Sequence, residues 1–192
     1  MISFAGKLTQ IKFAKPCKKN LFLLSKLQHF TDIKTRKLFY NAYILPHIDY
    51  SSTVWDGCSA ANLKKLNSLH RRSAKLVIGR NKSTGNTGTD SKLHSLSMLE
   101  LRKHFLFSKL TFMQKVILQR TPAYISAMFK PCNTPDKTLR NDLAVPKPRL
   151  DIYKTSLSYS GAEAWNKLPR NFKVTTTPST FRARLLEYML KS

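Results

Sequence analysis

A histidine and an aspartate stand two residues apart in the stretch "ILPHIDYSSTVW", and these types can act as a general base and its orienting carboxylate. Such a pair needs a nucleophile within hydrogen-bond reach, and three candidates follow closely in the chain. Side chains two positions apart on a helix point in different directions, so His47 and Asp49 are not predicted to face one another. The candidate nucleophiles are Ser51, Ser52 and Cys58.

The same stretch has a structural interpretation, which the pattern favours. Pro46 lacks a backbone donor and disfavours helix in the residue before it, so it is predicted to end one helix at Leu45. A short helical piece would then follow, with Tyr50 and Trp55 anchoring it beneath the next helix. We therefore predict a joint at this position and no catalytic residue.

Other catalytic and metal chemistry finds little support in the sequence. The ten acidic residues are scattered with no adjacent pair, and no phosphate loop of the GxxxxGK[ST] kind occurs. The cysteines Cys17, Cys58 and Cys132 lie far apart, without the spacing of a zinc site. We predict no metal site and no cofactor, and a reducing compartment.

The segment from Ser59 to Gly79 carries the strongest binding signal. Its helical spacing places Leu63, Leu66 and Val77 in one arc and the basic side chains opposite, with no acid between residues 57 and 89. A solvated face is the alternative, but the missing acids favour a surface that contacts phosphates. The predicted nucleic-acid-binding residues are Lys64, Lys65, Arg71, Arg72, Lys75, Arg80 and Lys82.

Two further residues of unusual type are predicted to be structural. His70 falls within the apolar arc of that helix, where a lone histidine is usually a hydrogen-bonded core residue. Trp165 follows a helix of small residues in "YSGAEAWNKLPR", and a packing anchor is favoured there over a base-stacking platform.

The overall charge limits the choice of partner. The 192 residues contain 34 Lys and Arg but 10 Asp and Glu, a net charge of +24. This imbalance predicts a polyanionic partner, with nucleic acid first and an anionic membrane surface second. The basic helix lacks the Trp- and Phe-rich face of membrane-surface helices, and no apolar run is long enough to span a bilayer.

The periodicity predicts a mostly α fold with long loops and a few short extended segments. Asp32 or Thr31 should cap a helix, and Gly79 should end another. Ser97 and Glu100 fit a capping box for a helix reaching about Gln119. Further helices are predicted near Lys18, from Thr121-Pro122, over 158–167 and from Pro178 to Leu190.

Several stretches, in this order, resemble the reverse transcriptases of non-LTR (LINE, jockey-like) retrotransposons from about Lys18 to the end. The segment "LFYNAYILPHIDYSSTVW" is similar to the one that follows the palm, and "LKKLNSLHRRSAKLVIG" to the next basic helix. The segments "LSMLELRKHF", "RTPAYISAMF", "TLRNDLAVPKPRL", "SYSGAEAWNKLP" and "STFRARLLEYM" resemble the C-terminal series. The family landmarks are Tyr40, Pro46, Tyr50, Trp55, Trp165, Asn166, Leu168 and Pro169.

The resemblance implies a thumb-like and C-terminal part of an RNA-directed DNA polymerase. That family holds two metal ions on palm aspartates, including an aromatic-x-Asp-Asp motif, and this sequence contains no Asp-Asp. The implied role is therefore binding of template and primer without polymerase activity. The implied division is a basic arm over 1–17, a thumb-like region over 18–80, a flexible loop over 81–91 and a C-terminal helical region over 92–192.

Two alternatives to this function stay open. One is a structural remnant without function, and the other is a nucleic-acid-binding protein retained by the host. The expected partners are RNA or DNA, together with the rest of a retrotransposon polymerase. No membrane partner and no secretion are expected, because the N-terminus has no signal-peptide pattern, and the expected location is the nucleus or the cytoplasm.

Overall fold

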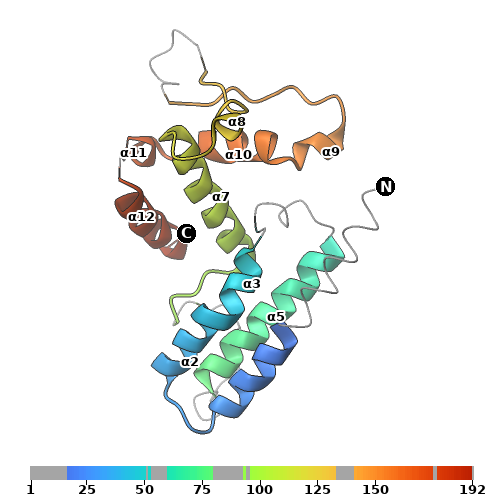
Figure 1. The fold of residues 1–192 in the computed structure, drawn as a ribbon, viewed down its shortest axis with the longest axis vertical. Coiled ribbons are helices and arrows are strands. Elements are labelled where there is room, and N and C mark those ends of the chain that lie inside the picture. Colours follow the sequence, from blue (N-terminus) through green and yellow to red (C-terminus); the bar gives the residue numbers. More distant parts are fainter. Residues whose placement is uncertain are drawn as a thin grey trace. The chain divides into compact units, whose positions relative to one another are not determined.

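The computed structural model confirms the mostly α class (Figure 1). It describes residues 17–50, 52, 60–79, 93, 96–132, 141–174 and 177–191. Within these ranges the one β feature is an isolated antiparallel bridge between Pro131 and Leu143. The predicted basic arm up to residue 16, the loop over 81–91 and Trp55 lie outside the described residues.

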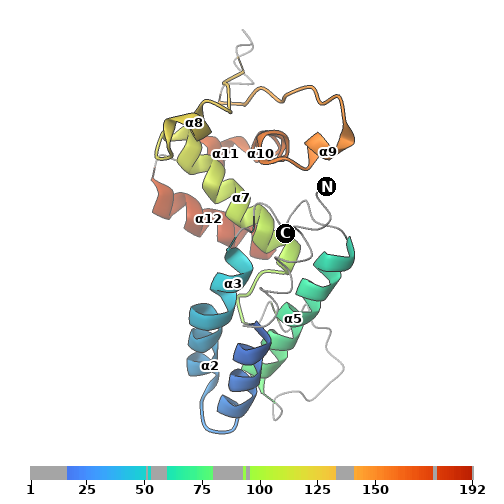
Figure 2. The same cartoon turned by 45° about the vertical axis from the view of Figure 1, so that its right-hand side comes forward.

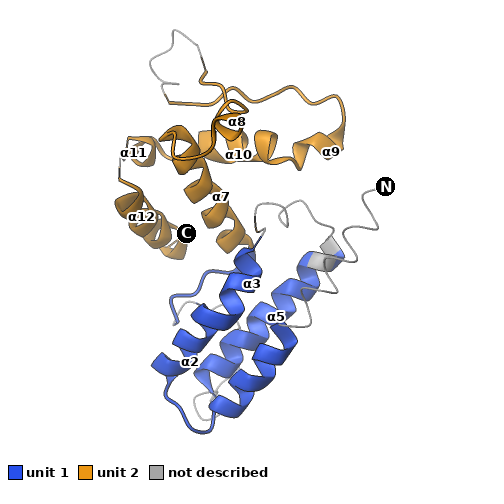
Figure 3. Cartoon of the chain, in the orientation of Figure 1, with its two compact units in different colours: residues 1–51, 59–101 blue, residues 52–58, 102–192 orange. Residues whose placement is uncertain are grey.

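The chain forms two compact units, coloured separately in Figure 3. The first comprises Met1–Ser51 and Ser59–Leu101, and the second comprises Ser52–Cys58 and Arg102–Ser192. Each unit is described by itself below. No helix in the described ranges is both long enough and apolar enough to cross a membrane.

Unit 1 is built from three helical segments that lie alongside one another (Figures 1 and 2). Residues 17–27 form the first segment. The second runs through α2 (Ile33–Phe39), η1 (Tyr40–Ile44) and α3 (Leu45–Asp49), and the third is α5 (Ala60–Ile78). The predicted N-cap of the second segment is confirmed, since Oδ1 of Asp32 accepts a hydrogen bond from the N–H of Thr35 at 3.0 Å.

The predicted break at Pro46 is wrong, because the helix continues through it. The N–H of Leu45 bonds the carbonyl of Tyr40, five residues back, so the turn before the proline is a wide π turn. In a regular α-helix a proline ring clashes with the carbonyl four residues before it. The wide turn shifts the carbonyls of the preceding residues, so the ring of Pro46 is tolerated inside the helical run. Of the helical piece predicted over Ile48 to Trp55, the first two residues belong to α3, which ends at Asp49, and Ser52 is helical. Residues 51 and 53–55 lie outside the described residues.

The spacing of the buried side chains explains the wide turn. Arg36, Tyr40, Ile44 and Ile48 are all buried and recur every four residues. An α-helix completes a turn in 3.6 residues, so this stripe would drift by about 40° per step around a regular helix. The π turn over Tyr40–Ile44 takes up part of this excess and keeps the stripe facing the other two helices.

Unit 2 contains the long helix α7 (Leu101–Ile117), apart from its first residue, and several shorter helices. These are α8 (Ala123–Ser126), α9 (Asp151–Lys154), α10 (Leu157–Asn166), α11 (Arg170–Lys173) and α12 (Pro178–Lys191). The helices predicted over 158–167 and from Pro178 are confirmed, but the capping box is wrong. Ser97 has a φ of +51°, and α7 begins four residues later, so Ser97 is not its N-cap.

The core of unit 2 is centred on Trp165, which is 2% exposed. Its ring stacks on Phe181 of α12 with centroids 6.0 Å apart, and its Nε1 donates to the carbonyl of Asn141 at 3.0 Å. A Cβ at Gly161 would lie 2.8 Å from the sulfur of Met113, so α10 and α7 approach closely there. The predicted packing role of Trp165 is thereby confirmed.

Candidate nucleic-acid interface

Helix α5 carries a basic face, defined here as Lys64, Lys65, Arg72 and Lys75. All four side chains are exposed, and Ser68 lies among them on the same side of the helix. The opposite side, with Leu66, Ala74 and Val77, is buried in unit 1. The predicted amphipathic pattern is therefore confirmed, because burying the apolar arc leaves the basic arc in solvent.

Among the described residues, no acid neutralises the basic face. None of its four side chains forms an ion pair with another residue in the described part of the chain. In unit 2, by contrast, exposed lysines pair with acids one helical turn away at 2.6–2.7 Å. These pairs are Lys154 with Asp151, Lys167 with Glu163, and Lys191 with Glu187.

The remaining predicted binding residues differ from these four. Arg71 is half-buried with its Nε enclosed, so it lies at the edge of the basic face and not on its open part. Arg80 and Lys82 fall outside the described residues. The structure thus brings four of the seven predicted residues together on one exposed surface.

A buried histidine links α5 to two other segments of unit 1. The Nε2 of His70 lies 2.9 Å from the carbonyl oxygen of Leu99, and its Nδ1 lies 2.9 Å from the hydroxyl of Tyr40. A carbonyl only accepts, so Nε2 carries a proton, and the Tyr40 hydroxyl donates to Nδ1 of the neutral ring. Burial, helped by the nearby Asp49 carboxylate, raises the pKa of Tyr40, which keeps that donor protonated. His70 is therefore the hydrogen-bonded core residue that the sequence predicted.

The C-terminal end of α5 is held by Arg36, a residue that the sequence analysis missed. Its guanidinium donates to the carbonyls of Gln28 and Ile78, at 3.0 and 3.4 Å. Gly79 follows with a φ of +86°, and a Cβ there would lie 2.9 Å from Nη1 of Arg36. The signal that could have revealed Arg36 is its position four residues before Tyr40, on the buried stripe.

Comparisons with known proteins add nothing to these observations. No protein-family model, no curated protein and no solved structure matches the chain.

The residues singled out by the sequence resemblance divide into buried and exposed ones. Tyr40, Trp165 and Leu168 are buried in the cores of their units. Pro169 is the N-cap of α11, Pro46 is exposed within α3, and Trp55 lies outside the described residues. Tyr50 is 74% exposed, so the prediction that it anchors a helix beneath α5 is wrong.

Asn166 connects α10 to the chain near the isolated bridge. Its Oδ1 accepts from the N–H of Leu143 at 2.9 Å, and its Nδ2 donates to the carbonyl of the same residue at 2.8 Å. This side-chain amide pairs with a backbone segment as a neighbouring strand would. Asn166 is thus a structural residue, which agrees with its interpretation as a folding landmark.

The candidate catalytic pair does not form part of this interface. His47 and Asp49 both lie on α3, two positions apart, where side chains point in different directions. Within the described ranges, no group of three or more His, Cys, Asp or Glu side chains could hold a metal ion. The basic face of α5 is suited to binding a polyanion.

Proposed function

We propose that this chain binds the phosphate backbone of RNA or DNA through the basic face of α5. The observation that carries the proposal is the set of four exposed cations without acidic partners in the described chain. Cations left open in this way gain by replacing the counterions condensed on a nucleic acid. The net charge of +24 adds long-range attraction that speeds association.

We further propose that the chain is the thumb-like and C-terminal part of a non-LTR retrotransposon reverse transcriptase. The ordered set of sequence resemblances supports this, and the mostly helical fold agrees with it. Because these 192 residues contain no Asp-Asp pair, the proposal assigns them binding and not nucleotide addition. A nuclear or cytoplasmic location follows from a nucleic-acid partner of this kind.

The test is fluorescence anisotropy with a labelled duplex over a range of salt concentrations. If the basic face contacts four phosphates, log K should fall with log salt with a slope of about −3 to −4. The variant Arg72→Glu/Lys75→Glu should weaken binding at least tenfold and reduce that slope. A slope near zero would overturn the proposal.

A matched control comes from unit 2. The variant Lys154→Glu/Lys167→Glu changes the net charge by the same amount, and both lysines are exposed. It should lower affinity less than the α5 variant, since only the long-range attraction is reduced. Equal losses in the two variants would mean that overall charge, and not the basic face of α5, controls binding. Full folding and no binding at low salt would instead favour a structural remnant.

A further inference from the structure

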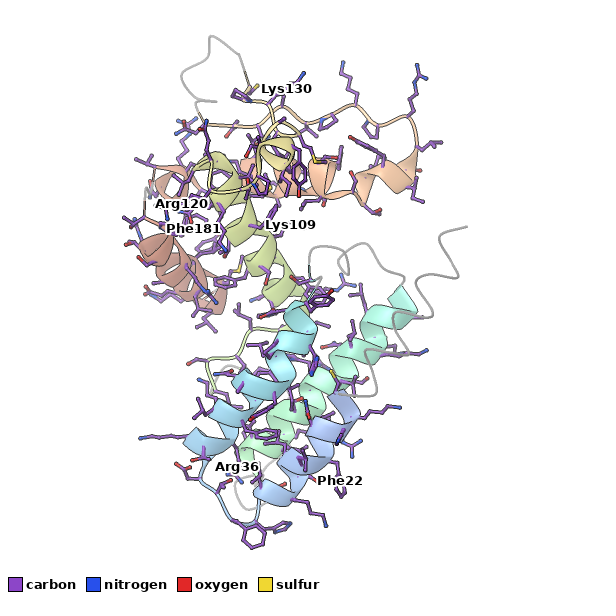
Figure 4. The ribbon with its side chains drawn as sticks, viewed as in Figure 1. Phe22, Arg36, Lys109, Arg120, Lys130 and Phe181 are labelled. Carbon is purple, nitrogen blue, oxygen red and sulfur yellow. The ribbon has the colours of Figure 1, made fainter. Side chains whose placement is uncertain are left out.

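The first helical segment of unit 1 exposes an aromatic ring among lysines. Phe22 is 60% exposed, and Figure 4 shows its side chain pointing away from the other helices of its unit. Lys18, Lys19 and Lys26 precede or follow it by one helical turn. At 100° per residue, all three lie within about 60° of Phe22 around the helix axis.

This face, defined as Lys18, Lys19, Phe22 and Lys26, is the outer side of a fixed helix. The inner side, with Cys17, Leu21 and Leu24, is buried. The side-chain amide of Asn20 also donates to the carbonyl of Tyr43 in η1 at 2.7 Å, which ties the helix to its neighbour. The ring is therefore presented on a rigid support and not on a loop, so little ordering is needed when it binds.

Like the basic face of α5, this face carries exposed lysines, and it also carries the aromatic ring of Phe22. None of its three lysines forms an ion pair with a described residue, and residues 1–31 contain no acid. The Nζ of Lys26 lies 5.5 Å from the centroid of the Phe22 ring, in a cation–π contact on one of its two faces. Because 60% of Phe22 is exposed, a flat partner can still reach the ring.

We infer that this face binds single-stranded nucleic acid, with one base stacked on Phe22 and the neighbouring phosphates held by the lysines. Basic grooves with aromatic platforms are the usual means of holding unpaired strands, because every base has a face that can stack. A duplex keeps its bases stacked internally and would use the lysines alone. The inference rests on the proposed function and adds to it a second contact surface and a preference for unpaired strand.

The test compares two polymers with equal numbers of phosphates. One is a labelled oligothymidylate, and the other is an abasic strand of the same length. The protein should bind the oligothymidylate roughly tenfold more tightly, because stacking needs a base. Phe22→Ala should abolish this preference with little effect on duplex binding, whereas Phe22→Trp should keep it.

A matched control uses another exposed apolar residue of unit 1. Leu38 lies on α2 and is 69% exposed, so Leu38→Ala removes similar surface without touching the lysine-flanked ring. This variant should keep the preference for the oligothymidylate. Equal binding of both polymers by the unmodified protein, or a preference that survives Phe22→Ala, overturns the inference.

These outcomes separate the inference from the proposed function. Salt-dependent duplex binding that needs Arg72 and Lys75, combined with no preference for bases, overturns the single-strand site and leaves the α5 interface standing. No binding of duplex, oligothymidylate or abasic strand overturns both. The site is supported if Phe22→Ala loses the preference for the oligothymidylate while Leu38→Ala and Phe22→Trp keep it.

Discussion

The hydroxyl of Tyr40 and the Nδ1 of His70 lie 2.9 Å apart in the core of unit 1, joining η1 to α5. Both side chains are almost completely buried. This bond adds to the burial of Leu66, Ala74 and Val77, which turns the basic side of α5 to solvent. Its loss should affect the stability of the unit before it affects binding.

Tyr40→Phe should lower the free energy of unfolding by about 1–3 kcal/mol, because the buried hydrogen bond from the Tyr40 hydroxyl to Nδ1 of His70 would be lost. Urea denaturation followed by circular dichroism measures this. Tyr43→Phe is the control, since Tyr43 is exposed and should cost little. Equal effects of the two variants would contradict the role given to the Tyr40 hydroxyl.

The same bond predicts a pH dependence. Burial raises the pKa of Tyr40 above its ordinary value of about 10. The folded state then holds this proton more tightly than the unfolded state, so the stabilisation is complete below pH ~10 and is lost as the pH rises further. Tyr40→Phe should remove this part of the alkaline loss. Unfolding midpoints measured from pH 7 to 11 test it, and parallel curves for the two proteins would argue against it.

Gly79→Ala should destabilise unit 1 by roughly 1–3 kcal/mol, because the residue has a φ of +86°. An added Cβ would also press against Arg36, at 2.9 Å from Nη1. In an Arg36→Met background, Gly79→Ala should cost less stability, because the clash with Arg36 is removed while the backbone strain remains. A double-mutant cycle measured by urea denaturation separates the two, and strict additivity would show that Arg36 does not crowd this glycine.

Asn166→Asp should destabilise unit 2 by about 1–3 kcal/mol. A carboxylate can still accept from the N–H of Leu143, but it cannot donate to the carbonyl of that residue, which would then face a negative charge. Asn41→Asp, at an exposed position of η1, makes the same chemical change and should have little effect. Thermal unfolding of the two variants provides the comparison, and a stable Asn166→Asp protein would contradict the pairing.

Cys17 should resist alkylation until the protein unfolds. Burial raises the pKa of its thiol to about 11, so little thiolate is present at pH 8, and the sulfur is also shielded from reagent. Mass spectrometry after iodoacetamide treatment, with and without urea, measures the modification of the peptide that carries Cys17. Equal rates in the two conditions would show that this thiol is accessible in the folded protein.

Several elements could be predicted because their causes are local. The spacing of Leu66, Ala74 and Val77 predicted the buried side of α5. The same helical periodicity placed Lys64, Arg72 and Lys75 on the opposite side. Asp32 and Gly79 were recognised as helix ends because each acts on groups within a few residues. His70 was interpreted correctly because its position on an apolar arc limits it to a core role.

Other elements were predicted wrongly because a local rule was overridden. Pro46 was expected to end a helix, but the π turn over Tyr40–Ile44 lets the helix continue. Ser97 and Glu100 matched a capping box, yet Ser97 adopts a positive φ. At Pro46 the local preference is worth a few kcal/mol, and burial of the stripe from Arg36 to Ile48 exceeds it.

The sequence by itself determined the helical class, the amphipathic pattern of α5 and the acid-free clustering of charge, because these depend on spacing and composition. Only the tertiary structure decided the contacts of Arg36 with Ile78 and of Asn166 with Leu143, which join residues 42 and 23 positions apart. It also decided that Phe22 faces solvent among three lysines. The physical reason is that hydrogen bonding and burial of a side chain depend on which distant groups the packed helices bring to it, and periodicity along one helix does not contain that information.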